Sequence, residues 1–179
     1  MNFQSTILTI PGIGGSGPTH WQTLWEKEYG FTCVQQREWD TPDSDEWVET
    51  INNYIQKLDP ANLIVVAHSA ACVAFIHWVK KYNVVIKGAL LVAPADADAP
   101  TFPPGTSGFA PVPLNKLPFP SIVVTSSNDH FVTLERARQF ADVWGSQFVN
   151  IGEAGHINVA SEYGEWQQGL EILNDLDCI

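Results

Sequence analysis

Positive charge is scarce in this sequence. Only 9 lysines and arginines stand against 20 aspartates and glutamates, which leaves a formal net charge of −11. A surface of this sign repels phosphate backbones and anionic lipid headgroups. No basic run offsets the repulsion locally. We therefore expect neither nucleic acid nor a membrane surface to be the main partner.

Cysteine and long apolar runs are scarce as well. The three cysteines, Cys33, Cys72 and Cys178, are odd in number, far apart and without metal-ligand spacing. Free thiols in a reducing cytoplasm are the simplest interpretation. No segment approaches the length of a membrane-spanning helix, and residues 1–10 lack the basic start of a signal peptide. We expect a cytoplasmic protein with one domain over residues 1–179.

Short β-rich segments alternate with helix-like segments along the chain. The expected strands are Ser5–Ile10, Thr32–Gln36, Leu63–Ala67, Ile86–Val92, Ser121–Ser126 and Gln147–Ile151. The expected helices include Ser44–Leu58, with Ser44 as N-cap, Ala70–Tyr82, Thr133–Trp144 and Glu165–Leu176. Near-continuous apolar runs are typical of strands buried on both faces of a parallel sheet. The alternation predicts an α/β fold with helices on both faces of a mainly parallel sheet.

One long segment, residues 94–120, interrupts this alternation. It holds 8 of the 12 prolines and shows little periodicity, so we expect an ordered loop at the edge or mouth of the sheet. The segment is too short for a helical lid domain. An open, shallow site follows from this, with Phe102 and Phe109 as candidates for apolar walls.

A serine stands where a buried strand meets a helix. The residues Ala67-His68-Ser69-Ala70-Ala71 correspond to the G-x-S-x-G nucleophile elbow, with alanine at both glycine positions. Small residues are needed there because the turn is tight and neighbouring segments approach closely. The competing interpretation is that Ser69 merely caps the following helix.

An acid and a base follow two later strands in the order that this elbow requires. Asp129 follows Ser121–Ser126, and His156 follows Gln147–Ile151. Open α/β sheets carry their sites at the carboxyl ends of parallel strands. We therefore predict that Ser69, Asp129 and His156 form a catalytic triad, with Asp96 as the second choice for the acid.

A glycine-rich loop follows the first strand, and two interpretations compete for it. Gly12, Gly14 and Gly17 fit G-x-G-x-x-G, with Glu38 and Asp40 about twenty residues further on, as in a dinucleotide fold. Pro18 argues against this interpretation because a helix should already be running there. The hydrolase interpretation instead uses backbone amides, those of Ile13 or Gly14 together with Ala70, as an oxyanion hole.

Taken together, these motifs resemble a family of small serine hydrolases that includes bacterial YdeN-like proteins and human retinoblastoma-binding protein nine. The resemblance covers nearly the whole chain and rests on Pro11-Gly12, His20-Trp21, Trp25-Glu26, Ala67-His68-Ser69, Asp129 and Gly155-His156. It implies a compact α/β-hydrolase fold of about six strands in the order 2-1-3-4-5-6 without a large cap. The human protein's L-x-C-x-E motif does not occur here, so its partner is not carried over.

The resemblance and the motifs together predict a carboxylesterase-like serine hydrolase. His20, Trp21, His68 and Asp96 are further candidates for pocket residues, beside Phe102 and Phe109. Hydrolysis of small carboxylic esters or amides through an acyl-enzyme needs no metal or organic cofactor. The alternative is a binding or scaffold protein that keeps the fold with little turnover.

Overall fold

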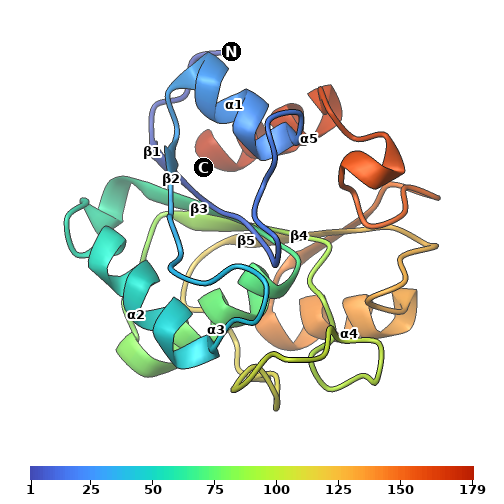
Figure 1. The fold of residues 1–179 in the computed structure, drawn as a ribbon. Helices are drawn as coiled ribbons and strands as arrows, with labels where there is room; N and C mark the ends of the chain where they lie inside the picture. Colours follow the sequence, from blue (N-terminus) through green and yellow to red (C-terminus); the bar gives the residue numbers. More distant parts are fainter.

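A computed structural model describes residues 1–179 (Figure 1). Six strands form one parallel sheet in the order β2-β1-β3-β4-β5-β6, which confirms the expected order. Their bounds are β1 (Thr6–Ile10), β2 (Thr32–Cys33), β3 (Leu63–His68), β4 (Gly88–Val92), β5 (Ser121–Thr125) and β6 (Gln147–Asn150). All five strand pairs are parallel, so the carboxyl ends of the strands share one edge of the sheet.

The helices cover both faces of this sheet. They are α1 (Trp21–Tyr29), α2 (Ser44–Ile55), α3 (Ala70–Tyr82), α4 (Leu134–Trp144) and α5 (Gln167–Asp177), with short 3₁₀ turns at Pro60–Asn62 (η1) and Val159–Ser161 (η2). Figure 1 shows α1 and α5 on one side of the sheet and α2, α3 and α4 on the other. No helix is both long enough and apolar enough to cross a membrane.

Strand β3 explains why the sheet is buried on both faces. All six of its residues are buried, and successive side chains of a strand point to opposite faces. Leu63, Val65 and Ala67 join the core beneath α2, α3 and α4, whereas Ile64 and Val66 join the smaller core beneath α1 and α5. The near-continuous apolar run in the sequence therefore serves two separate cores.

The expected boundaries match within a few residues, with two corrections. Strand β2 ends at Cys33 rather than Gln36, because this edge strand pairs with β1 over two residues before the chain turns away. The N-cap of α2 is Asp43 rather than Ser44, since the Asp43 carboxylate accepts a hydrogen bond from the amide of Glu46 at 3.1 Å. Ser44 is the first residue of the helix.

Residues 94–120 contain no helix and no named strand, as their composition predicts. The segment nevertheless contributes to the core, with Phe109, Val112, Leu117 and Phe119 all buried. Phe109 packs edge-to-face on Trp47 of α2, with ring centroids 5.7 Å apart. The apolar side chains of residues 94–120 therefore cover α2 and α3 rather than forming a lid.

The two ends of the chain are joined by one buried carboxylate. Asp177, the last residue of α5, accepts hydrogen bonds from the amides of Gln4 at 2.6 Å and Ser5 at 3.1 Å. Lys87 donates to the same carboxylate at 3.2 Å. Burial alone would raise the pKa of Asp177, but the bonds from Ser5, Gln4 and Lys87 lower it below its ordinary value of 3.8.

We predict that Asp177→Asn lowers the free energy of unfolding by about 1–3 kcal/mol, because buried donors lose their charged acceptor. Asp175→Asn, an exposed change on the same helix, should stay within about 0.5 kcal/mol. Denaturant unfolding measures both.

Because the pKa of Asp177 is lower in the folded protein, its carboxylate stabilises the fold at pH values above 3.8, its pKa in the unfolded chain. This contribution is lost as the pH falls through the lower pKa of the folded state. Equal stability of the two variants would contradict the role assigned to Asp177.

Candidate active site at the strand ends

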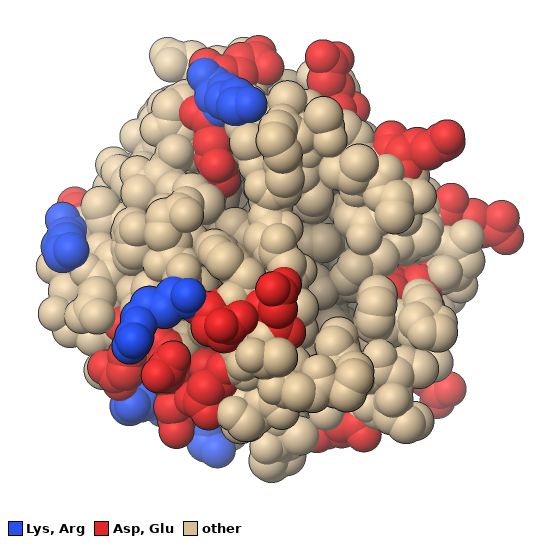
Figure 2. Space-filling model, in the orientation of Figure 1, with Lys and Arg blue, Asp and Glu red and all other residues tan.

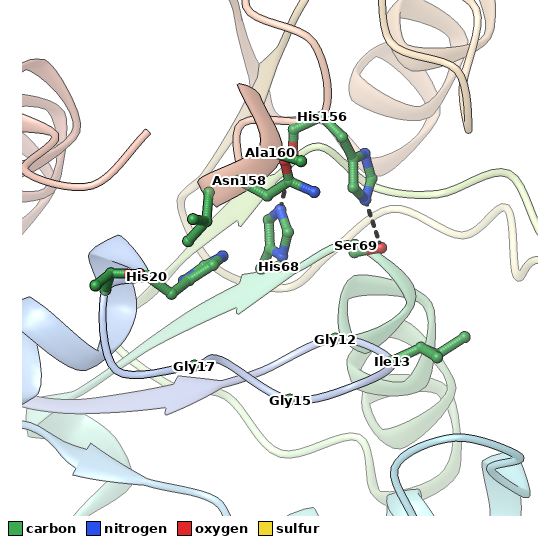
Figure 3. Close-up of a pocket in the computed structure, with 12 residues that line it drawn as sticks. Gly12, Ile13, Gly15, Gly17, His20, His68, Ser69, His156, Asn158 and Ala160 are labelled. Atoms are coloured by element: carbon green, nitrogen blue, oxygen red, sulfur yellow. Dashed lines mark hydrogen bonds between the residues drawn. The ribbon is translucent and has the colours of Figure 1, made fainter. Parts of the chain in front are cut away.

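Three polar side chains meet where β3, β5 and β6 end. Ser69 directly follows β3, Asp129 follows β5 by four residues, and His156 follows β6 by six residues. Figure 3 shows the imidazole of His156 extending from its loop toward Ser69. The parallel sheet thus gathers residues that are 87 and 27 positions apart in the chain.

Ser69 occupies a strained turn between β3 and α3. Its backbone has φ 60° and ψ −130°, a conformation that costs a non-glycine residue about 1–3 kcal/mol. The turn is held by the Ser69 amide, which donates to the carbonyl of Val92 at 3.0 Å. The side chain of Ser69 makes no capping bond to α3. This geometry favours the nucleophile elbow over the helix-cap interpretation.

The hydroxyl of Ser69 is free to face His156 instead. Its Oγ lies 2.8 Å from Nε2 of the imidazole. On the far side of the ring, Nδ1 lies 3.0 Å from Oδ1 and 2.8 Å from Oδ2 of Asp129. A carboxylate beside Nδ1 holds the proton on that nitrogen, so Nε2 presents its lone pair to the serine.

The side chain of Asp129 is fully buried and well oriented. It has no exposed surface, and its Oδ1 accepts a hydrogen bond from the amide of Phe131 at 2.8 Å. The Phe131 ring lies 4.6 Å from the imidazole of His156, centroid to centroid. The short loop of residues 129–131 therefore holds both the Asp129 carboxylate and the Phe131 ring against the imidazole of His156.

A second set of hydrogen bonds joins the acid loop to the histidine loop. The Oδ1 atom of Asn128 accepts from the Gly155 amide at 2.7 Å and from the Ser126 hydroxyl at 2.7 Å. Ser126 in turn accepts from the amide of Ala154 at 2.9 Å. Asn128 and Ser126 were not singled out from the sequence, although Ser126 ends the predicted strand and Asn128 directly precedes Asp129.

The rival acid, Asp96, is engaged elsewhere. Its Oδ2 lies 3.2 Å from Nε of Arg136, and the neighbouring Asp98 pairs with the same guanidinium at 2.7 Å. No hydrogen bond links Asp96 to His156. The structure brings Asp129, and not Asp96, to the imidazole.

The three amides expected to form the oxyanion hole differ in whether they are already hydrogen-bonded. The amide of Gly14 donates to the carbonyl of Trp39 at 2.9 Å, so it is already used and the expectation for Gly14 is wrong. The amide of Ile13 has no partner within the chain. Ala70 is the first residue of α3, where a helix leaves its amides unpaired. Ile13 and Ala70 remain as the available pair.

A cleft of about 330 Å³ opens beside Ser69. Twelve residues line it: Gly12, Ile13, Gly15, Gly17, Thr19, His20, His68, Ser69, His156, Asn158, Val159 and Ala160. Of the expected pocket residues, only His20 and His68 are among them. Asn158, Val159 and Ala160 come from the loop after His156, and no sequence motif marked them.

The other expected pocket residues lie outside this cleft. Trp21 is fully buried and donates from Nε1 to the carbonyl of Ile157 at 2.9 Å, so it supports the histidine loop from below. Phe102 and Phe109 pack on each other, with centroids 5.5 Å apart, on the side of the sheet that carries α2. Asp96 is held by Arg136. Of the expected aromatic walls, Phe109 is thus a core residue and Phe102 is half-buried against the same core.

Burial keeps the two cleft histidines uncharged near neutral pH. Burial and, to a lesser extent, the charge of the nearby His156 together lower the pKa of His20 from 6.5 to about 4. Burial, followed by the charges of His156 and His20, lowers the pKa of His68 well below 6.5. The two other histidines of the chain lie outside the cleft: a ring nitrogen of His77 lies 2.9 Å from the carbonyl oxygen of Phe109, and His130 is exposed.

The structure gives no support to the dinucleotide interpretation of the glycine loop. Helix α1 begins at Trp21, four residues after Gly17, and β2 ends well before Glu38. Glu38 accepts hydrogen bonds from its own loop, at the amides of Asp40 and Thr41.

Figure 2 shows acidic side chains predominating over basic ones on the face drawn, as the net charge implies.

Comparison with known proteins finds one matching family and solved structures of the same fold. A family model described as serine hydrolase matches residues 7–175. The crystal structure of a YdeN-like hydrolase from Pectobacterium atrosepticum is 32% identical, with a TM-score of 0.86 over 96% of this chain and 90% of that one. The ydeN gene product of B. subtilis is 17% identical, with a TM-score of 0.84 over 98% and 100%.

A more distant match concerns the fold alone. A monoacylglycerol lipase from Paleococcus ferrophilus is 13% identical, with a TM-score of 0.72 over 99% of this chain and 96% of that one. No curated protein sequence matches the chain.

Gly12 generates a stability prediction. A Cβ at this position would lie 2.9 Å from the Ser69 Cβ and 3.0 Å from the His68 carbonyl oxygen, closer than packed atoms tolerate. Gly12→Ala should therefore reduce the free energy of unfolding by about 1–3 kcal/mol. Gly17→Ala is the control, because its Cβ meets nothing within 4 Å and its effect should stay near 0.5 kcal/mol. Urea unfolding of both variants measures the difference, and a neutral Gly12→Ala would refute this close contact.

Proposed function

Since this chain belongs to the serine hydrolase family, we propose that it hydrolyses small carboxylic esters, or amides, through an acyl-enzyme intermediate formed on Ser69. The observation that carries the proposal is the continuous hydrogen-bonded series from Ser69 through His156 to Asp129. A serine so placed, at 2.8 Å from an oriented imidazole, has the geometry of an activated nucleophile.

In the proposed reaction His156 is the general base. As the Ser69 Oγ attacks the substrate carbonyl, its proton passes to Nε2, and the buried carboxylate of Asp129 stabilises the resulting imidazolium. The imidazolium then protonates the leaving alcohol or amine, and the carbon–oxygen or carbon–nitrogen bond breaks. Base assistance of this kind contributes about 10²–10⁴-fold to the rate.

Deacylation uses the same groups in the same order. A water gives its proton to His156 and attacks the acyl carbonyl, and the proton then returns to Ser69 as the acid product leaves. In both steps the amides of Ile13 and Ala70 would donate to the negatively charged carbonyl oxygen. One such donor is worth about 10²–10³-fold in kcat when it is fixed in advance.

The first test is covalent labelling. We expect a fluorophosphonate probe to label the wild-type protein and to label neither Ser69→Ala nor His156→Ala, because both the nucleophile and its base are required. Mass spectrometry locates the adduct, and circular dichroism verifies that the variants are folded. A folded wild-type protein that takes up no label would refute the proposal and favour a binding or scaffold role on this fold.

The second test separates the two candidate acids. Asp129→Asn should lower kcat on p-nitrophenyl acetate by about 10⁴-fold, because an amide at this position no longer holds the imidazole in the productive tautomer. Asp96→Asn should stay within about threefold of wild type, since Asp96 pairs with Arg136 and not with His156. A reversed order of the two variants in steady-state kinetics would assign the acid to Asp96.

A further inference from the structure

The cleft contains polar atoms that the proposed hydrolysis does not use. They belong to His20, His68 and Asn158, which lie on one side of Ser69 (Figure 3). The ring centroids of His20 and His68 are 5.1 Å apart, and that of His68 is 5.0 Å from His156. These three residues therefore form the wall of the cleft next to the reacting groups.

The tautomer of His20 is set by a helix cap. His20 is the N-cap of α1, and its Nδ1 accepts a hydrogen bond from the Gln22 amide at 3.2 Å. An uncharged imidazole that accepts at Nδ1 carries its proton on Nε2. The Nε2–H group has no partner within the chain. Figure 3 shows the ring extending from the loop toward His68.

His68 is fixed in a similar way by the histidine loop. Its Nε2 lies 3.0 Å from the carbonyl oxygen of His156, which can only accept, so this nitrogen must donate. The Nδ1 atom of the uncharged ring then carries a lone pair, again without a partner in the chain. One free donor and one free acceptor consequently lie on neighbouring rings.

Asn158 adds a second donor. Its Oδ1 accepts from the Ser161 amide at 3.1 Å, which identifies the other atom of the side-chain amide as Nδ2. That nitrogen makes no hydrogen bond within the chain. Buried side-chain nitrogen and oxygen atoms without a partner occur only in Trp25, Gln36 and Trp166. The free atoms of His20, His68 and Asn158 therefore reach accessible surface.

The cleft lining contains no lysine, arginine, aspartate or glutamate. With both imidazoles kept uncharged by burial, no cation faces a substrate carboxylate and no anion faces a substrate ammonium. Fixed donors and an acceptor without charge suit a neutral group that both accepts and donates. A hydroxyl is the smallest such group, and three of the twelve lining residues are glycines that leave it room.

Resting on the hydrolase function proposed above, we propose that this wall selects hydroxylated esters, with His20 Nε2–H and Asn158 Nδ2–H donating to the substrate hydroxyl and His68 Nδ1 accepting from it. His20 is thereby a specificity-determining residue. The hydroxyl belongs either to the acyl part or to the alcohol part of the ester, and the two sources are distinguishable by experiment.

Two pairs of esters test the proposal, each pair differing by a hydroxyl in place of a methyl group. The acyl pair is p-nitrophenyl 3-hydroxybutyrate and p-nitrophenyl 3-methylbutyrate, and the alcohol pair is 2-hydroxyethyl butyrate and propyl butyrate. In the pair whose hydroxyl reaches the wall, we expect kcat/KM of wild type to be about tenfold higher for the hydroxylated ester than for the methyl ester. One or two neutral hydrogen bonds provide a difference of this size. Ratios within twofold in both pairs, or a preference for methyl, would overturn the inference.

The variant His20→Asn assigns the preference to His20. Asparagine still caps α1 but is too short to place a donor where Nε2 lies. We expect the ratio of kcat/KM between the hydroxylated and the methyl ester of the selected pair to fall below twofold in His20→Asn, and circular dichroism verifies that the variant is folded. His130→Asn, the same change at an exposed position, should keep the wild-type ratio. A preference that survives in folded His20→Asn would refute the role of His20.

The two proposals fail in different ways. If wild type cleaves none of the four esters and takes up no fluorophosphonate, the hydrolase function itself is refuted. If it takes up the label and cleaves both members of each pair equally well, only the selection of hydroxylated esters is refuted.

Discussion

The site depends on one backbone turn, the junction at Ser69 between a strand buried on both faces and a helix packed beneath it. A positive φ at a serine is unfavourable by itself, and the turn persists because its surroundings hold it from several sides. The Ser69 amide donates to Val92 of the neighbouring strand, and the Cys72 thiol donates to the Ala67 carbonyl at 3.3 Å. Gly12 lies against the outer side of the turn, where no larger residue fits.

The parallel sheet places the other residues of the site next to this turn. Because β1, β3, β5 and β6 are parallel, their carboxyl ends place the glycine loop, the serine, the acid and the histidine along one edge of the sheet. The hydrogen bonds of Asn128 then join the acid loop to the histidine loop, which fixes Asp129 and His156 relative to each other. Rigid strands provide the coarse placement of these side chains, and loop-to-loop hydrogen bonds provide the final few tenths of an ångström.

The sequence predicted the fold well because its signals are local and repeated. Apolar runs such as Leu63–Ala67 indicate buried parallel strands, and the strand-end positions of Ser69, Asp129 and His156 follow from strand order alone. The cleft was predicted less well. Whether an amide such as that of Gly14 is free depends on a carbonyl 25 residues away in the loop at Trp39. Likewise, Phe102 and Phe109 are apolar residues in a proline-rich loop, and nothing local shows that they turn toward α2 rather than toward the cleft.

The N-cap at His20 has a consequence for how this architecture can diversify. Serine, threonine, aspartate and asparagine all cap helices well, so position 20 can exchange its side chain while α1 stays anchored. Each exchange would present a different chemical group to the cleft beside His68, whose ring centroid lies 5.1 Å from that of His20. Position 20 itself lies in the loop before α1, apart from the segments that carry Ser69, Asp129 and His156, so a lineage can alter this part of the cleft wall by a single substitution.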